Sequence, residues 1–379
     1  MTKRAKNPMF KVRRTDKPYY ICRDSQGMVD AESVIPAARP LSLQPEIRPT
    51  PLSALALEDL PTELHFVRSH FGVPPLDTQT WVLTLGGAVE RARYFSLADL
   101  QRRPARTQTV VLECAGHRRN EFQPSTSGLQ WGLGAVSEAR WTGVPLVELL
   151  AEVSPTGRSC EVLFEGADRG PHRSSSKEVP FARSIPFERA LKGDVLLAWE
   201  MNGRPIPPKH GAPLRAIVPG SYGVASVKWL RRIELLDRPF NGLFQIQDYH
   251  VNGEPLHDLR ANSLILKPGP GDAIATGPVE LFGIAWGGRG GIAAVEFRLG
   301  GASWQPATIR RRPQQPSGLT RWSALLELPP GEQVVEARAR DRAGQIQPDE
   351  PEWNVLGYAN NSIHRVPITV SATRSLVRS

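Results

Sequence analysis

Residues that could do chemistry gather in one short segment, residues 110–122, which reads VVLECAGHRRNEF. Cys114 ends an apolar, β-rich run, and His117, Arg118 and Arg119 follow it closely. A thiolate acts either as a nucleophile or as a ligand for a soft metal. As a nucleophile it would use His117 as its base, and the two arginines would lower the pKa of the thiol. As a ligand it would leave the arginines free to bind an anionic substrate or a cofactor phosphate, and a buried structural cysteine is the third possibility.

A second segment, residues 199–235, combines flexible glycines with His210, Arg215 and Lys228. A glycine-rich backbone beside cationic donors can approach a bulky anionic ligand closely. The familiar enzyme signatures GxGxxG, GxxxxGK[ST], HExxH and GxSxG do not occur in the sequence. These two segments are therefore the strongest candidates for a functional site.

Composition limits the class of protein that could carry such a site. The 379 residues are 40% hydrophobic and 22% charged, which indicates a soluble globular chain of two domains. Its 35 prolines and 33 glycines favour loops and β structure, and its three cysteines form no recognisable disulfide framework. The net charge of +9 attracts anions, but no zinc finger, RNA-binding aromatic signature or helix-turn-helix pattern indicates nucleic acid as a partner.

The sequence also suggests a compartment. No apolar run is long enough to span a membrane, and the basic start lacks the apolar stretch of a secretory signal. We therefore expect a cytoplasmic protein as the sequence stands, or a periplasmic one if a targeting segment is missing.

Three regions are expected along the chain, and together they predict an α+β protein. Residues 1–60, rich in proline and charge, predict an extended N-terminal arm, and residues 61–243 alternate strands with short helices. Those helices include one capped by Ser96 and one with Ser184 as its N-cap. Residues 244–379 show alternating apolar and polar segments with turn signals, which predict an immunoglobulin-like β-sandwich.

Several segments, taken in order, resemble the landmarks of the sulfite oxidase family. They are FVRSHFGVP, LECAGHRR, GLQWGLGAVSEARWTGVPL, FEGAD, HGAPLRAIVPGSYGVASVKWL and WNVLGYANNSIHRV, and the resemblance covers about residues 62–370. It implies a sulfite-oxidase-type mixed α/β molybdopterin domain, followed by a β-sandwich dimerisation domain and hence a homodimer. It also implies a Mo-molybdopterin cofactor whose dithiolene sulfurs hold the metal, with Cys114 as the protein ligand.

The same resemblance assigns the remaining site residues. It places Arg68, Arg119 and Arg365 around a pocket for a small oxyanion, with Trp131 as a wall and Tyr249 beside the metal. Guanidinium groups suit this task because they bind oxyanions through paired, charge-assisted hydrogen bonds. The positions that resemble pterin or phosphate contacts are Arg68, His70, Asp168, His210, Arg215 and Lys228.

Some features depart from the family pattern. His117 and Ser69 stand where the family usually has asparagine, and residues 168–186, DRGPHRSSSKEVPFARSIP, are unusually polar. We expect this polar stretch to shape the rim of the pocket or a docking patch for an electron acceptor.

The resemblance implies an enzyme that oxidises sulfite to sulfate by oxo transfer at molybdenum. The sequence has no haem motif, so the electrons would pass to a separate acceptor such as cytochrome c or oxygen. Two alternatives remain open: a reductase of the same fold that acts on nitrate or an S-oxide, and a non-catalytic protein that binds anions or a partner. The paired arginines and Trp131 favour a small oxyanion over a bulky sulfoxide.

Overall fold

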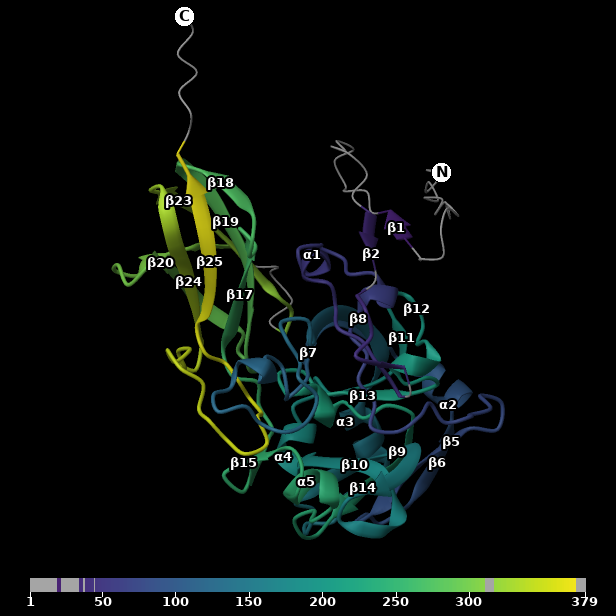
Figure 1. The fold of residues 1–379 in the computed structure, drawn as a ribbon. Helices are drawn as coiled ribbons and strands as arrows, with labels where there is room; N and C mark the ends of the chain where they lie inside the picture. Colours follow the sequence, from purple (N-terminus) through teal and green to yellow (C-terminus); the bar gives the residue numbers. More distant parts are fainter. Residues whose placement is uncertain (1–18, 22–33, 37, 44, 311–316, 373–379) are drawn as a thin grey trace, which may run out of the picture.

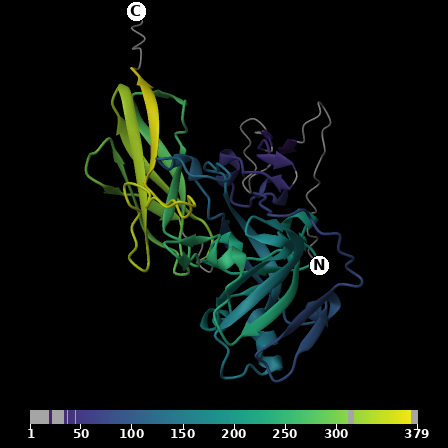
Figure 2. The ribbon, with the colours of Figure 1, turned by 60° about the horizontal axis from the view of Figure 1, so that its bottom comes forward.

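The computed structural model describes residues 19–21, 34–36, 38–43, 45–310 and 317–372. Figures 1 and 2 show two bodies: a larger one coloured blue to teal, and a β-sandwich coloured green to yellow that stands beside it in both views. We call the larger body the first domain and the sandwich the second domain.

Two twisted sheets form the first domain. One has the strand order β10-β9-β14-β5-β6. Its strands are β5 (Val82–Gly87), β6 (Arg93–Ser96), β9 (Glu161–His172), β10 (Ser175–Pro186) and β14 (Leu230–Leu236). The other has the order β12-β11-β8-β7, with β13 also paired to β11. Its strands are β7 (Arg106–Glu113), β8 (Val136–Pro145), β11 (Leu196–Met201), β12 (Arg204–Pro205) and β13 (Arg215–Ile217).

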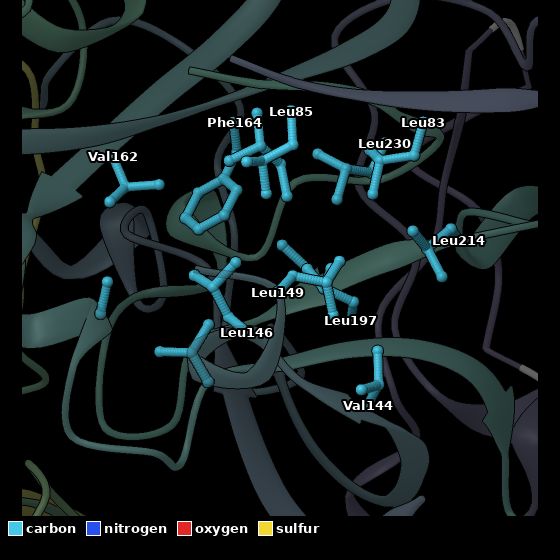
Figure 3. Close-up of a cluster of buried hydrophobic side chains, with 14 of the residues drawn as sticks. Leu83, Leu85, Val144, Leu146, Leu149, Val162, Phe164, Leu197, Leu214 and Leu230 are labelled. Carbon is cyan, nitrogen blue, oxygen red and sulfur yellow. The ribbon is translucent and has the colours of Figure 1, made fainter. Parts of the chain in front are cut away.

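A single apolar core joins these two sheets, because aliphatic side chains from both point into it (Figure 3). Leu83 and Phe164 come from the first sheet, and Val144 and Leu197 come from the second. Each of these four side chains is fully buried. Removing such area from water is the main driving force for the sheet pairing.

The helices are short, with four to eight residues in each α-helix. They are α1 (Leu52–Leu55), α2 (Leu97–Gln101), α3 (Leu146–Val153), α4 (Phe187–Ala190) and α5 (Leu243–Ile246). The 3₁₀ turns are η1 (Thr62–Leu64), η2 (Arg119–Glu121), η3 (Pro208–His210) and η4 (Gly223–Ala225). In the described part of the chain, no helix has the length and apolarity needed to cross a membrane. The first domain is therefore mostly β structure with short connecting helices.

One predicted helix cap is confirmed and the other is wrong. Ser96 caps α2 in a reciprocal capping box with Asp99. Ser184, the predicted cap of α4, remains in strand β10 opposite Leu163, and Pro186 takes the N-cap position. The cross-strand pairing of β10 with β9 continues past Ser184, so the helix starts later than local sequence signals indicate.

The second domain consists of two antiparallel-rich sheets, as the alternating pattern predicts. One sheet has the order β17-β19-β23-β22 and the other β18-β25-β24-β20-β21. The strands are β17 (Asn262–Lys267), β18 (Ala273–Ala275), β19 (Gly277–Trp286), β20 (Ile292–Leu299), β21 (Gln305–Pro306), β22 (Thr308–Arg310), β23 (Thr320–Leu328), β24 (Gly331–Asp341) and β25 (His364–Ser371). A small hairpin of β15 (His250–Val251) and β16 (Glu254–Pro255) precedes them.

The predicted N-terminal arm lies only partly within the described residues. The elements described there are β1 (Tyr19–Ile21), β2 (Val34–Pro36), β3 (Ser42–Leu43), β4 (Glu46–Ile47) and α1. Arg48 pairs with Val67 in an isolated β-bridge, and the amide of Thr50 donates to the carbonyl of Gly134 at 2.8 Å. The end of the arm is therefore packed onto the first domain instead of extending away from it.

The two domains meet along strand β7 and the residues that directly follow it. The amide of Val111 donates to the carbonyl of Ser317 at 2.8 Å, and the amide of Ala359 donates to the carbonyl of Ala115 at 2.8 Å. Ala359 belongs to the yellow segment that leaves the sandwich and runs down beside the first domain before β25 (Figure 1). The second domain thus supports the chain on both sides of Cys114.

A buried histidine makes the stability of the second domain sensitive to acid. His364 Nδ1 accepts a hydrogen bond from the amide of Ile265 at 3.0 Å, and burial lowers the pKa of His364 to about 3. Between pH 6.5 and 3 the unfolded chain therefore binds a proton that the folded protein does not, so stability falls as the pH falls. One such group changes the free energy of unfolding by about 1.4 kcal/mol per pH unit.

His364→Asn tests this linkage, because the asparagine oxygen can still accept from Ile265. Urea unfolding at pH 6.5 and pH 5 should show a smaller loss of unfolding free energy in the variant, by about 1.4 kcal/mol per unit. Equal losses in the two proteins would show that His364 is not responsible.

Candidate functional site

Cys114 lies directly after β7 and is held by backbone hydrogen bonds. Its amide donates to the carbonyl of Ala135 at 2.9 Å, and its own carbonyl accepts from the amide of His117 at 2.8 Å. The residue before it, Glu113, accepts from Trp286 Nε1 of the second domain at 2.9 Å. The thiol is buried, with 8% of the residue exposed, so it lies at the base of a pocket and not on the surface.

The electrostatics around the thiol differ from the sequence prediction. Burial raises the pKa of Cys114, and the nearby cations that oppose this rise are Arg68 and Arg119. Arg118, which the sequence also suggested, turns away and donates to the carbonyl of Ser362 at 2.7 Å. Arg119 does act to lower the thiol pKa as predicted, but the predicted net lowering is wrong, because desolvation is the larger effect. A thiol in this environment becomes a thiolate when a metal binds it.

His117 is not placed to act as a base for Cys114. Its ring packs edge-on against Trp286 of β19, with centroids 5.6 Å apart and an interplanar angle of 82°. Neither ring nitrogen has a hydrogen-bond partner among the described residues. Burial, with Arg118 and His364 nearby, lowers the pKa of His117 well below its usual value, so the ring is neutral. The nucleophile interpretation of the motif therefore loses the base that the sequence suggested for it.

The guanidinium of Arg119 is fixed by three backbone carbonyls. Its Nε lies 3.2 Å from the oxygen of Leu356 and 3.1 Å from that of Gly357, and its Nη1 donates to Leu129 at 3.0 Å. Its Nη2 makes no hydrogen bond to the described residues in this arrangement. Arg119 is 6% exposed. A fixed, buried cation with one free edge is suited to bind an anion.

Two glycines with positive φ, together with Gly116, make room for this arginine. A Cβ at Gly128 would lie 3.0 Å from Arg119 Nη1, and one at Gly357 would lie 3.0 Å from its Nε and 2.0 Å from Thr126 Oγ1. Both glycines have positive φ, +102° and +60°. A side chain at either position would strain the backbone and displace the guanidinium.

Residues from both domains surround the pocket above Cys114. Its lining includes Arg68, His70, Cys114, Arg119, Trp131, His172, Arg173, Asp248, Tyr249 and Tyr358. Four of the predicted catalytic residues, Arg68, Arg119, Trp131 and Tyr249, are thus brought together from distant parts of the sequence. The polar stretch of residues 168–186 forms the β9–β10 hairpin, and residues 171–173 at its tip line this pocket.

Tyr249 is held by a histidine and a second tyrosine. Its hydroxyl lies 2.5 Å from His70 Nε2, and its ring stacks on Tyr358 with centroids 5.1 Å apart and an angle of 12°. The guanidinium carbon of Arg119 lies 4.7 Å from the centroid of Tyr358, on which it makes a cation–π contact. Burial raises the pKa of Tyr249, so its hydroxyl keeps its proton.

Arg365 does not belong to this pocket, and its predicted role is wrong. It lies in β25 directly opposite Glu336 of β24, and its Nε donates to Glu336 Oε1 at 2.8 Å. It also pairs with Asp349 at 3.3 Å. The short HRV motif suggested an oxyanion contact, but the register of the sandwich instead uses this cation in a cross-strand ion pair.

A second cavity shares Cys114 and Tyr249 with this pocket. Its lining includes Arg68, Ser69, His70, Cys114, Asp168, Arg215, Ser226, Lys228 and Tyr249. Five of the predicted pterin or phosphate contacts therefore share one cavity: Arg68, His70, Asp168, Arg215 and Lys228. His210 lies outside the lining, where its carbonyl oxygen accepts from Arg215 Nη1 at 3.0 Å.

The donor set of this cavity fits a pterin that carries a phosphate. Asp168 Oδ1 is buried and has no hydrogen-bond partner among the described residues, so it can accept from pterin N–H groups. Burial raises the pKa of Asp168 to about 7, although Lys228 opposes the shift. Arg215 and Lys228 supply the cations that a phosphate needs, and burial lowers the pKa of both. A bound anion would relieve this cost of burying two cations.

Lys228 lies just before strand β14 and not in it. Strand β14 begins at Leu230, and Trp229 has φ +50°. Lys228 Nζ instead donates to Ser69 Oγ at 2.5 Å and to the carbonyl of Lys209 at 3.1 Å. Ser69, where the family usually has asparagine, thus still accepts a hydrogen bond at the cavity.

Sequence reasoning missed His172, Asp248 and Tyr358. Tyr358 lies inside the segment WNVLGYANNSIHRV, and Asp248 directly precedes Tyr249, so these positions were the available signal. His172 belongs to the stretch singled out for its polarity, but only the hairpin geometry brings it to the pocket.

Comparisons with known proteins agree with this arrangement. The molybdopterin-binding domain of oxidoreductases matches residues 70–244, and the dimerisation domain of molybdenum-cofactor oxidoreductases matches residues 254–371. The second match suggests a homodimer. The cavity with Asp168, Arg215 and Lys228 lies in the first of these regions, so a Mo-molybdopterin cofactor is implied by both the family and the donor set.

Human mitochondrial sulfite oxidase is 35% identical over 342 residues, covering 82% of this chain, and the chain spans 62% of that protein's length. Chicken sulfite oxidase is 34% identical, with 87% of this chain and 77% of the relative covered. Barley nitrate reductase [NAD(P)H] is 33% identical, with 82% and 39% covered.

Among solved structures, the sulfane dehydrogenase SoxCD from Paracoccus pantotrophus superposes with a TM-score of 0.74 at 30% identity, covering 87% of this chain and 88% of that chain. The buried cysteine, the arginine pocket and the cofactor cavity are thus found in a chain whose relatives are molybdenum oxidoreductases. The chain belongs to the sulfite oxidase family.

Proposed function

We propose that this protein oxidises sulfite to sulfate and passes the electrons to a separate acceptor. The observation that carries the proposal is the pocket in which Arg68 and Arg119 face the same buried thiol, Cys114. Sulfite is a small oxyanion, and two guanidinium groups beside one anchored metal can bind its oxygens. When bound, the molybdenum cofactor supplies the oxygen-transfer and two-electron chemistry.

Positioning of the anion would come from Arg119 and its surroundings. Its Nε and Nη1 are held by the carbonyls of Leu356, Gly357 and Leu129, so Nη2 is the edge available to substrate. Trp131 is 1% exposed and closes one side of the pocket. A cation fixed in advance loses little entropy on binding and is available to stabilise negative charge as the reaction proceeds.

The reaction also requires protons to leave, because sulfite and water give sulfate, two protons and two electrons. Tyr249 and His70 are placed to handle a proton, since the Tyr249 hydroxyl lies 2.5 Å from His70 Nε2. Burial and the nearby Arg68 lower the pKa of His70 well below its usual value, so its neutral ring can accept from the phenol. Burial and the neighbouring cations therefore keep the ring unprotonated, so that it can accept a hydrogen bond from the phenol.

A two-substrate assay with metal analysis tests the proposal. Protein made in a host that synthesises molybdopterin should contain about one molybdenum per chain and oxidise sulfite with ferricyanide as the acceptor. Turnover of nitrate by reduced viologen, without sulfite oxidation, would contradict it and identify a reductase. A molybdenum content near zero would instead favour a protein that binds anions or a partner without catalysis.

The reductase remains the second candidate because nitrate reductases are among the relatives. Oxygen transfer at such a centre can run in either direction, so an arginine pocket alone does not set the direction. The assay above therefore measures both reactions on the same preparation.

A further inference from the structure

The tip of the β9–β10 hairpin is attached to the turn that carries Tyr249. His172 Nε2 lies 3.0 Å from Asp248 Oδ2, and Arg173 Nη2 lies 2.6 Å from Asp248 Oδ1. Arg173 also donates to the carbonyl of Gln247 at 3.3 Å. Two consecutive hairpin residues therefore hold one carboxylate, and that carboxylate directly precedes Tyr249.

Hydrogen bonds on both sides of the His172 ring define its tautomer. Nδ1 accepts from the amide of Ser174 at 3.1 Å, so in the neutral ring the proton is on Nε2, which donates to Asp248. The ring is also packed edge-on against Phe244, with centroids 5.2 Å apart and an angle of 84°. His172 is 8% exposed. A ring fixed by two hydrogen bonds and one aromatic contact can hold its partner in place.

The same hairpin also contacts the chain before and after Tyr249 through Arg183. Arg183 of β10 is fully buried and donates to the carbonyl of Phe244 at 2.6 Å and to that of Leu256 at 2.7 Å. Between these attachments Tyr249 has φ +56°, a left-handed conformation that a tyrosine rarely adopts. Such a conformation persists only where the surroundings impose it.

We propose that His172 is a positioning residue for Tyr249. By donating to Asp248 it fixes the turn on which the phenol is mounted, and so keeps the hydroxyl against His70 and facing the pocket. The inference rests on the proposed function, because it assigns His172 a role in oxyanion oxidation at that site. Under this proposal the polar stretch of residues 168–186 positions a residue of the site, instead of docking an electron acceptor.

The kinetic test combines His172 variants with Tyr249→Phe. His172→Ala should lower kcat for sulfite about tenfold while KM changes less than about threefold, because a misplaced phenol affects the reaction more than binding. His172→Gln, whose amide can still donate to Asp248, should recover most of that loss. In the Tyr249→Phe background, His172→Ala should change kcat less than about twofold, since the hydroxyl is already absent.

The control is Lys177→Gln, a charge removal at an exposed position on the same hairpin, which should leave kcat and KM unchanged. An equal loss of kcat from His172→Ala with and without the Tyr249 hydroxyl would overturn the proposal. A rise in KM at unchanged kcat would overturn it as well, because His172 would then be a substrate contact.

Amide hydrogen exchange tests the positioning role of His172 without substrate, so its result does not depend on which substrate the protein uses. The amide of Asp248 donates to Leu243 at 3.0 Å, and that of Leu256 donates to Tyr249 at 2.8 Å. Without substrate, His172→Ala should speed exchange at both amides by about tenfold, and Lys177→Gln should not. Faster exchange in a protein that does not oxidise sulfite would support the positioning role and reject the substrate, and the kinetic arm would then use nitrate. Unchanged exchange would reject the positioning role whatever the substrate is.

Discussion

Cys114→Ser is expected to abolish turnover while leaving the fold and the bound pterin in place. A serine oxygen is a hard, weakly acidic donor, so it replaces a thiolate poorly at a soft metal centre. The loss should reach about a thousandfold or more, which corresponds to about 4 kcal/mol in the activation barrier. The pterin should remain because Asp168, Arg215 and Lys228, which face the cofactor cavity, are unchanged. Steady-state oxidation of sulfite, molybdenum content and pterin released on denaturation measure the three parts of this prediction.

Cys160→Ser is the matched control, because Cys160 is a free cysteine exposed just before β9. It should keep the activity, metal and pterin of the parent protein. Full activity in Cys114→Ser with a normal metal content would remove Cys114 from the ligand set and with it the basis of the site.

Arg119→Gln is expected to raise KM for sulfite about 10- to 100-fold, with a smaller effect on kcat. A hydrogen bond to a charged group contributes about 1.5–3 kcal/mol, which is the range of that change. Glutamine is also too short to reach the carbonyls of Leu356, Gly357 and Leu129 together, so the three-point support is lost. Initial rates over a wide range of sulfite concentration separate the KM effect from the kcat effect.

The control for this charge removal is Arg102→Gln, on a side chain that is 72% exposed and pairs only locally with Asp99. Both kinetic constants should stay as in the parent protein. If Arg119→Gln carries its full metal complement and shows the parent KM, Arg119 does not bind the substrate.

Cys114 and Arg119 could be identified from the sequence because one short motif carries both. The chain between them is a tight turn that leads into η2, so neighbours in sequence remain neighbours in the pocket. Arg68, Trp131 and Tyr249 lie far away in sequence, and only the resemblance placed them beside Cys114. The residue pattern around each of them does not indicate which distant residues lie near it in the folded chain.

The errors arose where tertiary pairing overrides a local pattern. The resemblance predicts Arg365 at the pocket from the short HRV motif, but its position opposite Glu336 is decided by strand register. Ser184 has the right type for a helix cap, yet β10 continues through it. The thiol pKa of Cys114 was judged from charged neighbours in the sequence, whereas burial determines its direction.

The carbonyl and aromatic partners of Arg119 come from both domains of this protein. A fragment that ended near residue 244 would retain Cys114 and the cavity residues Asp168, Arg215 and Lys228. It would lose Tyr249, Leu356, Gly357 and Tyr358. Arg119 would then keep one of its three carbonyl acceptors and no aromatic partner. We therefore expect truncation of the second domain to weaken the proposed oxyanion binding in each single chain, quite apart from any effect on pairing between chains.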